Sequence, residues 1–374
     1  MSPRNLIAAI ILALGLCNIA FGMMAQVVPL AMDAEHDSKF LIGANVMAGQ
    51  LGVLISGFSL TRLRKRFHSR SLVMFAIVLA LISFVGFAST SPVWYWFAVR
   101  FVAGLSMSAL FTTGESWLQT SAGDKARGRV MGSYMSSQTL TFAIGPFLIP
   151  FTGVSGAAPW LVSCGAVFLG LVLMSRVQVE DQTKAQPAAS IWATMANGKF
   201  LFLCIGMAAL FESLGLSFFT LFAINNGIAL AKATQILSFG IAAGILFFFP
   251  IGYLGDHWSR KGTIALCSVV AIVGCLLQGP LIGTLWIWPL IAVLRAGAFG
   301  VYLGGFGLLG DKFRGTQLVA ASSIVSIMWG ISGVIGPPLA GKAFDVYGLW
   351  LLPWLMAACY VPVLLALAAH PRQA

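Results

Sequence analysis

The sequence has few charged residues. Only 9% of its 374 residues are Asp, Glu, Lys or Arg, whereas 59% are hydrophobic. Soluble domains carry about a quarter charged residues, and no soluble fold of this length could bury so much apolar surface. The scarcity of charge therefore excludes a water-soluble globular protein and predicts a chain that lies in a lipid bilayer.

Potential metal ligands are scarce as well. The four histidines fall in predicted loops or at the C-terminus, and the six cysteines fall inside predicted hydrophobic spans. Cysteines in such spans are small apolar packing residues, and no Cys/His set has the spacing of a metal site. No nucleophile, base and metal ligands converge as a membrane enzyme would require, so we expect no catalytic residues, no metal and no cofactor.

Acidic residues are fewer than basic ones, 11 against 22, which gives a net charge of +11. Nucleic-acid binding would require a basic face on a folded surface. Here the basic residues lie in short loops between apolar runs, which is typical of membrane topology. We therefore expect the lipid bilayer and a small molecule as partners, and no nucleic acid.

Twelve apolar runs are long enough to cross a bilayer, which takes about 20 residues each. The first run is too long for the hydrophobic region of a signal peptide and is interpreted as a membrane helix. The sequence predicts an all-α integral membrane protein with twelve transmembrane helices at 6–31, 40–60, 71–90, 93–119, 130–151, 157–175, 200–223, 233–254, 263–283, 285–309, 318–340 and 348–369.

The basic residues also predict an orientation. With the N-terminus in the cytoplasm, 17 of the 22 Lys and Arg fall in inner segments, and only Lys39, Lys232 and Lys342 fall in outer loops. Cytoplasmic loops carry an excess of Lys and Arg, so this asymmetry favours an even number of spans with both termini inside. We expect a multi-pass protein of a bacterial inner membrane.

An internal repeat divides the chain. The sequence GDKARG at 123–128 recurs as GDKFRG at 310–315, identical at five of six positions. Repeats of this kind indicate two equivalent halves that enclose a substrate site near the bilayer midplane. The predicted domains are an N-terminal six-helix bundle at 1–176, a cytoplasmic linker at 177–197 and a C-terminal six-helix bundle at 198–374.

Several motifs resemble those of a known family. Residues 252–262, GYLGDHWSRKG, resemble the cytoplasmic-loop signature of the major facilitator superfamily, and Arg100 with Gly104 is similar to its helix-4 motif. The region 100–146 is most similar to a bacterial branch of small transporters near drug-efflux and sugar carriers. Five further residues resemble the family's Gly-Pro motif: Gly330, Gly333, Gly336, Pro337 and Gly341.

The resemblance implies two pseudo-symmetric six-helix bundles and a secondary transporter that works by alternating access. It also implies that Arg100 faces the interior with a role in proton transfer, and that Glu115 pairs with the first basic loop. Two departures are visible. Thr61 stands where the family usually has Asp, and Gly145-Pro146 keeps only the end of the helix-5 motif that marks antiporters.

Four ionisable residues lie well inside predicted spans, namely Arg100, Glu115, Glu212 and Arg295. Each costs about 2.5–3.5 kcal/mol at a helix centre, so each needs a structural or functional reason. Glu212 lies near the middle of its span and is the strongest candidate for coupling transport to protons or for binding a cation or substrate. The alternative is a neutral acid that is hydrogen-bonded to a neighbouring helix.

The other three residues have structural alternatives too. Glu115 is predicted to form a salt bridge with the basic cluster at 62–66, because buried charges are usually paired, although a coupling role stays open. Arg100 can take part in proton transfer or donate to backbone carbonyls of a packed helix. The same two alternatives hold for Arg295.

A second charged group is expected to form a cytoplasmic gate. Asp256 is predicted to dock on the positive N-terminus of the eleventh helix, while Arg260 and Lys261 reach helix C-terminal carbonyls. Asp311 and Arg314 can join this network. Contacts that hold in one state and break in the other make a transporter two-state, and the alternative is that these charges only set the topology.

Polar and aromatic residues inside the spans are candidates for the substrate cavity. They would suit an amphipathic or aromatic solute, although aromatic residues at helical spacing are more often simply packed. The candidates are Asn18, Gln26, Asn45, Gln50, Gln138, Tyr302 and Trp329.

The predicted function is secondary active transport of a small molecule, coupled to protons, by a monomer that is not an enzyme. Export of amphipathic compounds is favoured. The alternative is uptake of a small nutrient, such as a sugar, an organic anion or a flavin-like vitamin, by proton symport or uniport. A channel or a sensor would not need two matched halves.

Overall fold

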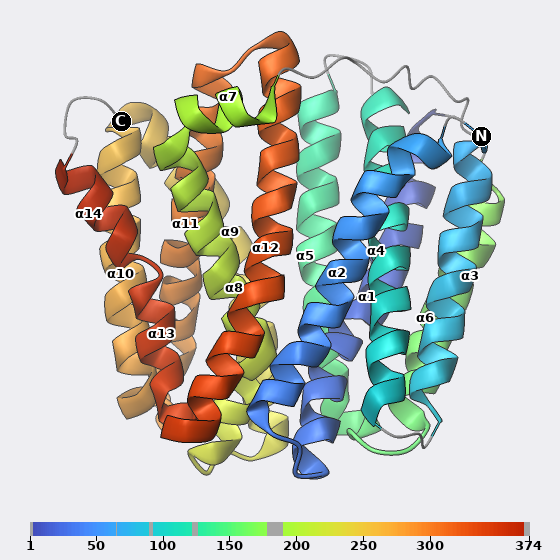
Figure 1. The fold of residues 1–374 in the computed structure, drawn as a ribbon, viewed down its shortest axis with the longest axis horizontal. Coiled ribbons are helices and arrows are strands. Elements are labelled where there is room, and N and C mark those ends of the chain that lie inside the picture. Colours follow the sequence, from blue (N-terminus) through green and yellow to red (C-terminus); the bar gives the residue numbers. More distant parts are fainter. Residues whose placement is uncertain (1–2, 65, 90–92, 122–125, 178–189, 370–374) are drawn as a thin grey trace. The chain divides into compact units, whose positions relative to one another are not determined.

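The structure is a computed structural model that describes residues 3–64, 66–89, 93–121, 126–177 and 190–369. In these ranges every regular element is a helix and no strand occurs (Figure 1). The first six helices are α1 (Pro3–Ala34), α2 (Lys39–Leu63), α3 (Ser69–Phe87), α4 (Val93–Ser121), α5 (Arg127–Thr152) and α6 (Ala158–Ser175).

The rest of the described chain is helical as well. A short helix leads into the second set of long helices, and a 3-10 turn precedes the last two. They are α7 (Ile191–Asn197), α8 (Lys199–Asn225), α9 (Leu230–His257), α10 (Arg260–Leu281), α11 (Ile287–Lys312), α12 (Gly315–Tyr347), η1 (Leu349–Leu351), α13 (Leu352–Ala358) and α14 (Val361–Ala369).

The long helices confirm the predicted all-α membrane fold. In the described part of the chain, 11 helical segments are long and apolar enough to cross a bilayer, with Leu349–Ala369 taken as one of them. Helix α5 is the twelfth, with 26 residues. It is less apolar than the others because Ser136, Ser137 and Gln138 interrupt its hydrophobic sequence.

The twelfth predicted span, 348–369, is not one continuous helix. It is divided into η1, α13 and α14, with a break at Cys359–Tyr360. The cause is Pro362, which has no N–H to donate to the carbonyl of Ala358 four residues earlier. The chain tightens there, and the Tyr360 N–H bonds to the Ala357 carbonyl at 3.1 Å.

The predicted linker at 177–197 contains a helix that the sequence reasoning did not expect. Helix α7 occupies the last part of this segment, and the Ser190 hydroxyl caps it by accepting from the Ala193 N–H at 3.5 Å. Residues 178–189 lie outside the described residues, as do residues 122–125 of the first GDKARG copy. Helix α7 lies across the ends of α8 and α12 (Figure 1).

The chain divides into two compact units. The first consists of Met1–Asp37 and Ala44–Ala185, and the second of Ser38–Gly43 and Gln186–Ala374. In the first unit α1 packs against α4, α5 and α6, and α3 packs against α4. In the second unit α8 packs against α11, α12, α13 and α14, and α10 packs against α11. The two units therefore repeat one plan of helix pairing.

The segment Ser38–Gly43 belongs to the second unit because its backbone is hydrogen-bonded to the carboxylate of Asp345. Asp345 near the end of α12 accepts from the backbone N–H groups of Lys39 at 2.6 Å and Phe40 at 3.0 Å. These N–H groups begin α2 and have no acceptor within their own helix. A negative charge at a helix N-terminus is also favourable for the helix dipole.

Close helix packing in the first unit depends on a glycine. A Cβ atom at Gly145 of α5 would lie 2.3 Å from the backbone nitrogen of Met23 in α1. Only glycine allows the two backbones to approach this closely. The Gly145-Pro146 pair, noted in the sequence as a family feature, therefore sets the contact between α1 and α5.

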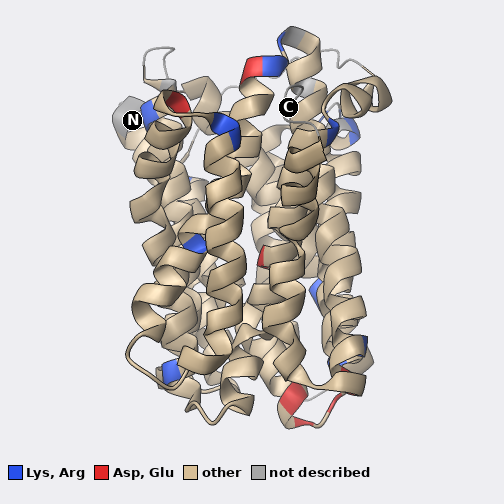
Figure 2. Ribbon diagram, turned by 90° about the vertical axis from the view of Figure 1, so that its left-hand side faces the viewer, with Lys and Arg blue, Asp and Glu red and all other residues tan. Residues whose placement is uncertain are grey.

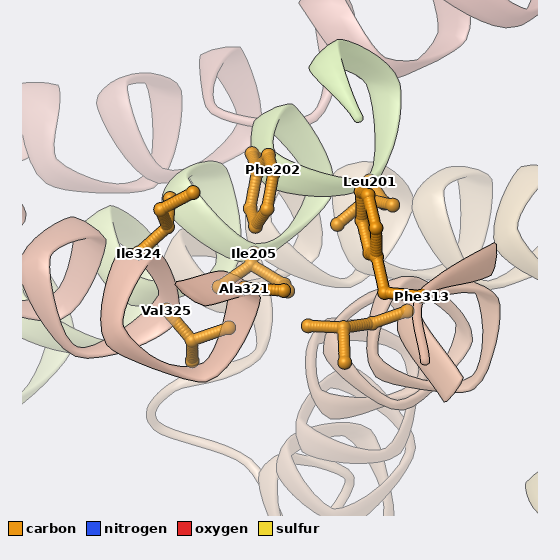
Figure 3. Close-up of a cluster of buried hydrophobic side chains, with 8 residues drawn as sticks. Leu201, Phe202, Ile205, Phe313, Ala321, Ile324 and Val325 are labelled. Carbon is orange, nitrogen blue, oxygen red and sulfur yellow. The ribbon is translucent and has the colours of Figure 1, made fainter. Parts of the chain in front are cut away.

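In the second unit a hydrophobic cluster joins α8, α11 and α12 near the start of α8 (Figure 3). Its members are buried apolar side chains. They are Leu201, Phe202, Ile205, Leu309, Phe313, Ala321, Ile324 and Val325. Phe202 and Phe313 stack with ring centroids 6.2 Å apart. We call this group the α8–α11–α12 cluster, and it fixes the ends of three helices relative to one another.

Candidate functional site

Glu212 of α8 and Arg295 of α11 form an ion pair inside the second unit. Oε2 of Glu212 accepts from Nη1 of Arg295. The Arg295 side chain is 9% exposed and the Glu212 side chain 23% exposed. The acid that the sequence singled out therefore has a cationic partner, and part of its side chain is not covered by protein.

Aromatic rings surround this ion pair. The Arg295 guanidinium carbon lies 6.0 Å from the ring centroid of Phe211, at the limit of a cation–π contact. Phe211 in turn packs on Tyr360, with ring centroids 5.4 Å apart. Tyr360 is fully buried, and its hydroxyl has no hydrogen-bond partner among the described residues. The pair is thus flanked by apolar rings, which strengthen the attraction between its charges, and one unsatisfied hydroxyl lies nearby.

Arg100 of α4 is in the same kind of position in the first unit but has a different partner. Its Nη1 donates to the backbone carbonyl of Met24 in α1 at 3.4 Å. The residue is 6% exposed. Its stem lies along α2, where a Cβ atom at Gly49 would be 3.1 Å from the Arg100 Cγ. This is the contact expected of an arginine that donates to a packed backbone.

Glu115 also lies in the first unit, near the end of α4. Tyr134 of α5, a buried side chain, donates its hydroxyl proton to Glu115 Oε1 at 3.0 Å. The basic cluster at 62–66 was the predicted partner. From this cluster Arg64 reaches the same helix, where its Nη2 donates to Thr113 Oγ1 at 2.9 Å. The structure therefore adds a tyrosine partner that the sequence reasoning did not name.

Amide side chains of the first unit form part of the candidate cavity set. Asn18 of α1 donates through Nδ2 to the backbone carbonyl of Gln138 in α5 at 2.7 Å. The amide atoms of Gln138 and of the fully buried Asn45 have no partner among the described residues. Gln26 is buried on α1 and Gln50 is half-buried on α2. Unsatisfied buried amides are rare, and they favour a site that takes water or a solute.

The aromatic candidates lie side by side in the second unit. Tyr302 of α11 contacts Trp329 of α12 edge to face, with ring centroids 5.9 Å apart. Phe299 and Phe306 flank Tyr302 at 5.3 Å and 5.9 Å. Tyr302 and Trp329 also pack against the α8–α11–α12 cluster. The structure thus provides a continuous aromatic surface along α11.

Three of the five predicted gate residues form one network at the ends of α9, α10 and α11. Arg260 lies 3.1 Å from Asp256 and 2.7 Å from Asp311. Figure 2 shows that most Lys, Arg, Asp and Glu residues lie at the helix ends and that a few lie in the middle of helices. Lys261 is the second residue of α10, and Arg314 is the N-cap residue of α12.

A glycine lets Arg260 reach across α11. A Cβ atom at Gly307 would lie 1.9 Å from Nη1 of Arg260, so a larger residue would displace the guanidinium. The signature at 252–262 also fixes the turn between α9 and α10. The Ser259 hydroxyl accepts from the Gly262 N–H at 3.2 Å, and Tyr253 stacks on His257 with centroids 3.9 Å apart. The turn thereby keeps the Asp256 and Arg260 side chains close enough to form their ion pair.

A family model described as the Major Facilitator Superfamily matches residues 10–306. The chain belongs to the Major Facilitator Superfamily. The uncharacterized MFS-type transporter YfkF of Bacillus subtilis (strain 168) is 21% identical over 345 residues, which are 89% of this chain and 87% of that relative. The uncharacterized MFS-type transporter YcaD of Escherichia fergusonii is 25% identical over 373 residues, which are 96% of this chain and 94% of that relative.

Solved structures of the superfamily have the same fold. The nucleoside transporter NupG has a TM-score of 0.79 at 14% identity, and the alignment covers 98% of this chain and 99% of that one. A bacterial homologue of the human lysosomal transporter Spinster has a TM-score of 0.73 at 13% identity, with 97% and 92% covered. The family model confirms the predicted membership, and the likenesses to these structures confirm the twelve-helix fold. Membership also establishes a membrane-embedded, multi-pass transporter.

The main feature that sequence reasoning missed is the partner of Glu212. The sequence identifies Arg295 as a charge inside a span, but it does not predict that Arg295 forms an ion pair with Glu212. A signal was present, because these two were the only ionisable residues well inside the spans of the second half, and their charges are opposite. Tyr134 gave no such signal, because a tyrosine is common in a membrane helix and carries no charge.

Proposed function

We propose that this member of the superfamily is a proton-coupled secondary transporter of small amphipathic molecules, with Glu212 as the coupling acid. The observation that carries the proposal is the ion pair between Glu212 and Arg295. An ionisable pair inside the membrane is costly and marks a proton or substrate pathway by default. The repeated helix plan of the two units supports alternating access as the mechanism.

The pair can act as a switch because its attraction depends on the proton. Ionised Glu212 holds Arg295 by charge and hydrogen bonding. When a proton adds to the carboxylate, the charge attraction is lost and the Arg295 guanidinium must find another acceptor. A switch requires two arrangements whose balance the proton can bias. The Glu212 side chain is 23% exposed, and this partial exposure supports the proposed proton-binding role.

Two sets of side chains support an amphipathic substrate. The aromatic surface of Tyr302 and Trp329 suits an apolar or aromatic moiety. In the first unit, the unsatisfied amides of Gln138 and Asn45 can donate to or accept from polar atoms of a solute. Apolar walls and a few polar groups are the two kinds of lining that small-molecule sites typically use.

We also propose that the protein lies in a bacterial inner membrane with both termini in the cytoplasm, and that it functions as a monomer. The asymmetry of Lys and Arg between alternate loops supports the orientation. The expected direction of transport is export of amphipathic compounds.

The coupling role is tested in proteoliposomes that contain a pH-sensitive dye, screened against a panel of amphipathic cations, nucleosides and sugars. Wild-type protein should move protons when a transported compound is added. Glu212→Gln should retain counterflow exchange of that compound but lose the proton flux. Glu35→Gln makes the same change at an exposed residue beyond the end of α1 and should behave as wild type.

Two results would contradict the proposal. Proton flux that persists in Glu212→Gln would exclude Glu212 as the coupling acid. Compound movement with no proton flux in wild type would exclude proton coupling itself. The direction is read in the same vesicles by imposing the pH gradient from either side, and accumulation with an inward proton gradient would establish uptake instead of export.

A further inference from the structure

A cavity of about 580 Å³ lies at the end of the second unit where α8 begins and α11 ends. Its polar residues include Asn197, Lys199, Asp311 and Lys312, and its apolar residues include Leu203 and Leu308. We propose that this cavity binds the phosphate headgroup of an anionic phospholipid, with Lys199 and Lys312 as its cationic ligands. The inference concerns a site separate from Glu212 and does not depend on the proposed coupling.

The charges of the cavity favour an anion. Lys199 and Lys312 are both exposed cations on its wall. The single acid on the wall, Asp311, is already paired with Arg260 at 2.7 Å. The two lysines therefore leave a net positive rim. Basic pockets between membrane helices on the cytoplasmic side attract anionic lipid headgroups.

The start of α8 adds backbone donors to the same rim. Its N-cap residue is Gly198, which has no side chain that could accept from the N–H groups of the first turn. The first N–H groups of a helix have no acceptor within the helix, and they point toward an anion placed there. The Gly198 N–H is already bonded to the Thr194 and Met195 carbonyls of α7, whereas Lys199 and Phe200 of the first turn line the cavity together with the lysine amines.

The apolar wall suits an acyl chain. Leu203 and Leu308 are half-buried on the cavity wall, and Ala366 of α14 lines the cavity as well. Leu201 lines the cavity and also belongs to the α8–α11–α12 cluster (Figure 3), so the cavity borders a packed hydrophobic group. A site with a cationic rim above an apolar wall matches the division of a phospholipid into headgroup and chain. A free phosphate ion would use the rim alone.

Helix α7 places the cavity at a membrane–water interface. Trp192 is 79% exposed and Ile191 is 37% exposed on this short helix. Exposed tryptophan is typical of the headgroup level of a bilayer. Ala196 and Asn197 at the end of α7 line the cavity, so the helix that carries Trp192 also borders the proposed headgroup.

The test uses the full-length protein in nanodiscs that contain equal amounts of phosphatidylethanolamine and phosphatidylglycerol. Lipids retained by the protein are counted by native mass spectrometry after gentle release. We expect retention of phosphatidylglycerol over phosphatidylethanolamine, and a loss of about tenfold or more in Lys199→Gln/Lys312→Gln, since each basic residue contributes to anionic-lipid binding. A photoreactive phosphatidylglycerol should crosslink to peptides spanning 196–203 and 308–312.

Lys232→Gln/Lys342→Gln is the matched control, because it removes two lysines from the opposite, outer side of the predicted topology. It should retain phosphatidylglycerol as wild type does. An equal loss of retained phosphatidylglycerol in both double variants would show that the lipid is held by overall charge attraction, and it would contradict a specific site. Competition by inorganic phosphate alone would identify a free-anion site instead. Crosslinks confined to other peptides, or equal retention of the two lipids, would also contradict the proposal.

Discussion

The two units use the same helix pair to hold a buried arginine, but they satisfy it differently. In the first unit Arg100 of α4 donates to the Met24 carbonyl of α1. In the second unit Arg295 of α11 pairs with the Glu212 carboxylate of α8. A carbonyl is a fixed acceptor that no proton can change, whereas a carboxylate changes its charge. The difference teaches that one scaffold can satisfy a buried arginine with a neutral backbone carbonyl in one half and with an acidic side chain in the other.

The largest expected effect is on stability when one member of the second pair is removed. Arg295→Gln leaves the Glu212 carboxylate unpaired in the membrane, and we expect a loss of about 3 kcal/mol in the free energy of unfolding. Arg100→Gln removes one long hydrogen bond to a neutral carbonyl, and we expect a loss of about 1 kcal/mol or less. The measurement is unfolding in mixed detergent–SDS micelles.

A double variant sharpens this comparison. Glu212→Gln/Arg295→Gln removes both charges and should regain most of the stability lost in Arg295→Gln, because no unpaired charge remains. Equal losses in the free energy of unfolding for Arg100→Gln and Arg295→Gln would contradict the predicted difference between the two arginines.

The next effect concerns the acid of the first unit. Tyr134→Phe removes the hydroxyl that donates to Glu115 but keeps the ring, so the carboxylate loses one hydrogen bond in a buried site. We expect a loss of about 1–2 kcal/mol in the free energy of unfolding. Tyr347→Phe, at an exposed tyrosine, is the control and should have no measurable effect. An unchanged stability in Tyr134→Phe would mean that another donor replaces the hydroxyl.

A smaller effect is expected at the gate network of the second unit. Gly307→Ala places a methyl group where the Arg260 guanidinium lies and should separate Arg260 from Asp311. Because both side chains are partly exposed, at 32% and 57%, the stability change should stay below about 1 kcal/mol. The rate of transport should change more than stability does, if the network holds one state. Gly310→Ala, where a Cβ atom meets open space, is the control.

The smallest effect is expected at Asp37, between α1 and α2. Partial burial, together with the nearby charge of Glu35, raises the pKa of Asp37 above its ordinary value of 3.8. The folded state then binds the proton more tightly than the unfolded state, so Asp37 disfavours folding as the pH rises above 3.8. Asp37→Asn should melt like wild type below that pH and slightly higher at pH 7. A lower melting temperature at pH 7 would contradict the sign.

Hydropathy predicted most of the fold, because a bilayer imposes length and composition on every crossing segment. The features that it did not predict are local. Pro362 breaks the last span. The proline is visible in the sequence, but the apolar residues around it have the hydropathy of one continuous span, so the break was not predicted. Helix α7 is short and partly polar, so it gives no hydropathy signal. The sequence reasoning therefore merged it with the linker.

For the candidate site, sequence could find charges but not their partners. Glu212 stood out because an acid inside a span is costly, whereas its pairing with Arg295 depends on how α8 packs against α11. The contact between Tyr302 and Trp329 is also tertiary, since the two residues lie on different helices. The gate residues Asp256 and Arg260 are only four apart on the chain, on either side of the turn between α9 and α10, so their pairing was within reach of sequence proximity.

The break at Cys359–Tyr360 has a mechanical consequence. The last crossing consists of two short helices, α13 and α14, and it lacks the regular backbone hydrogen bond at Pro362, which has no N–H to donate. Tyr360 lies at this break, and its ring packs on the ring of Phe211, the residue that precedes Glu212. A change in the angle between α13 and α14 would therefore move a ring that packs beside the ion pair of Glu212 and Arg295.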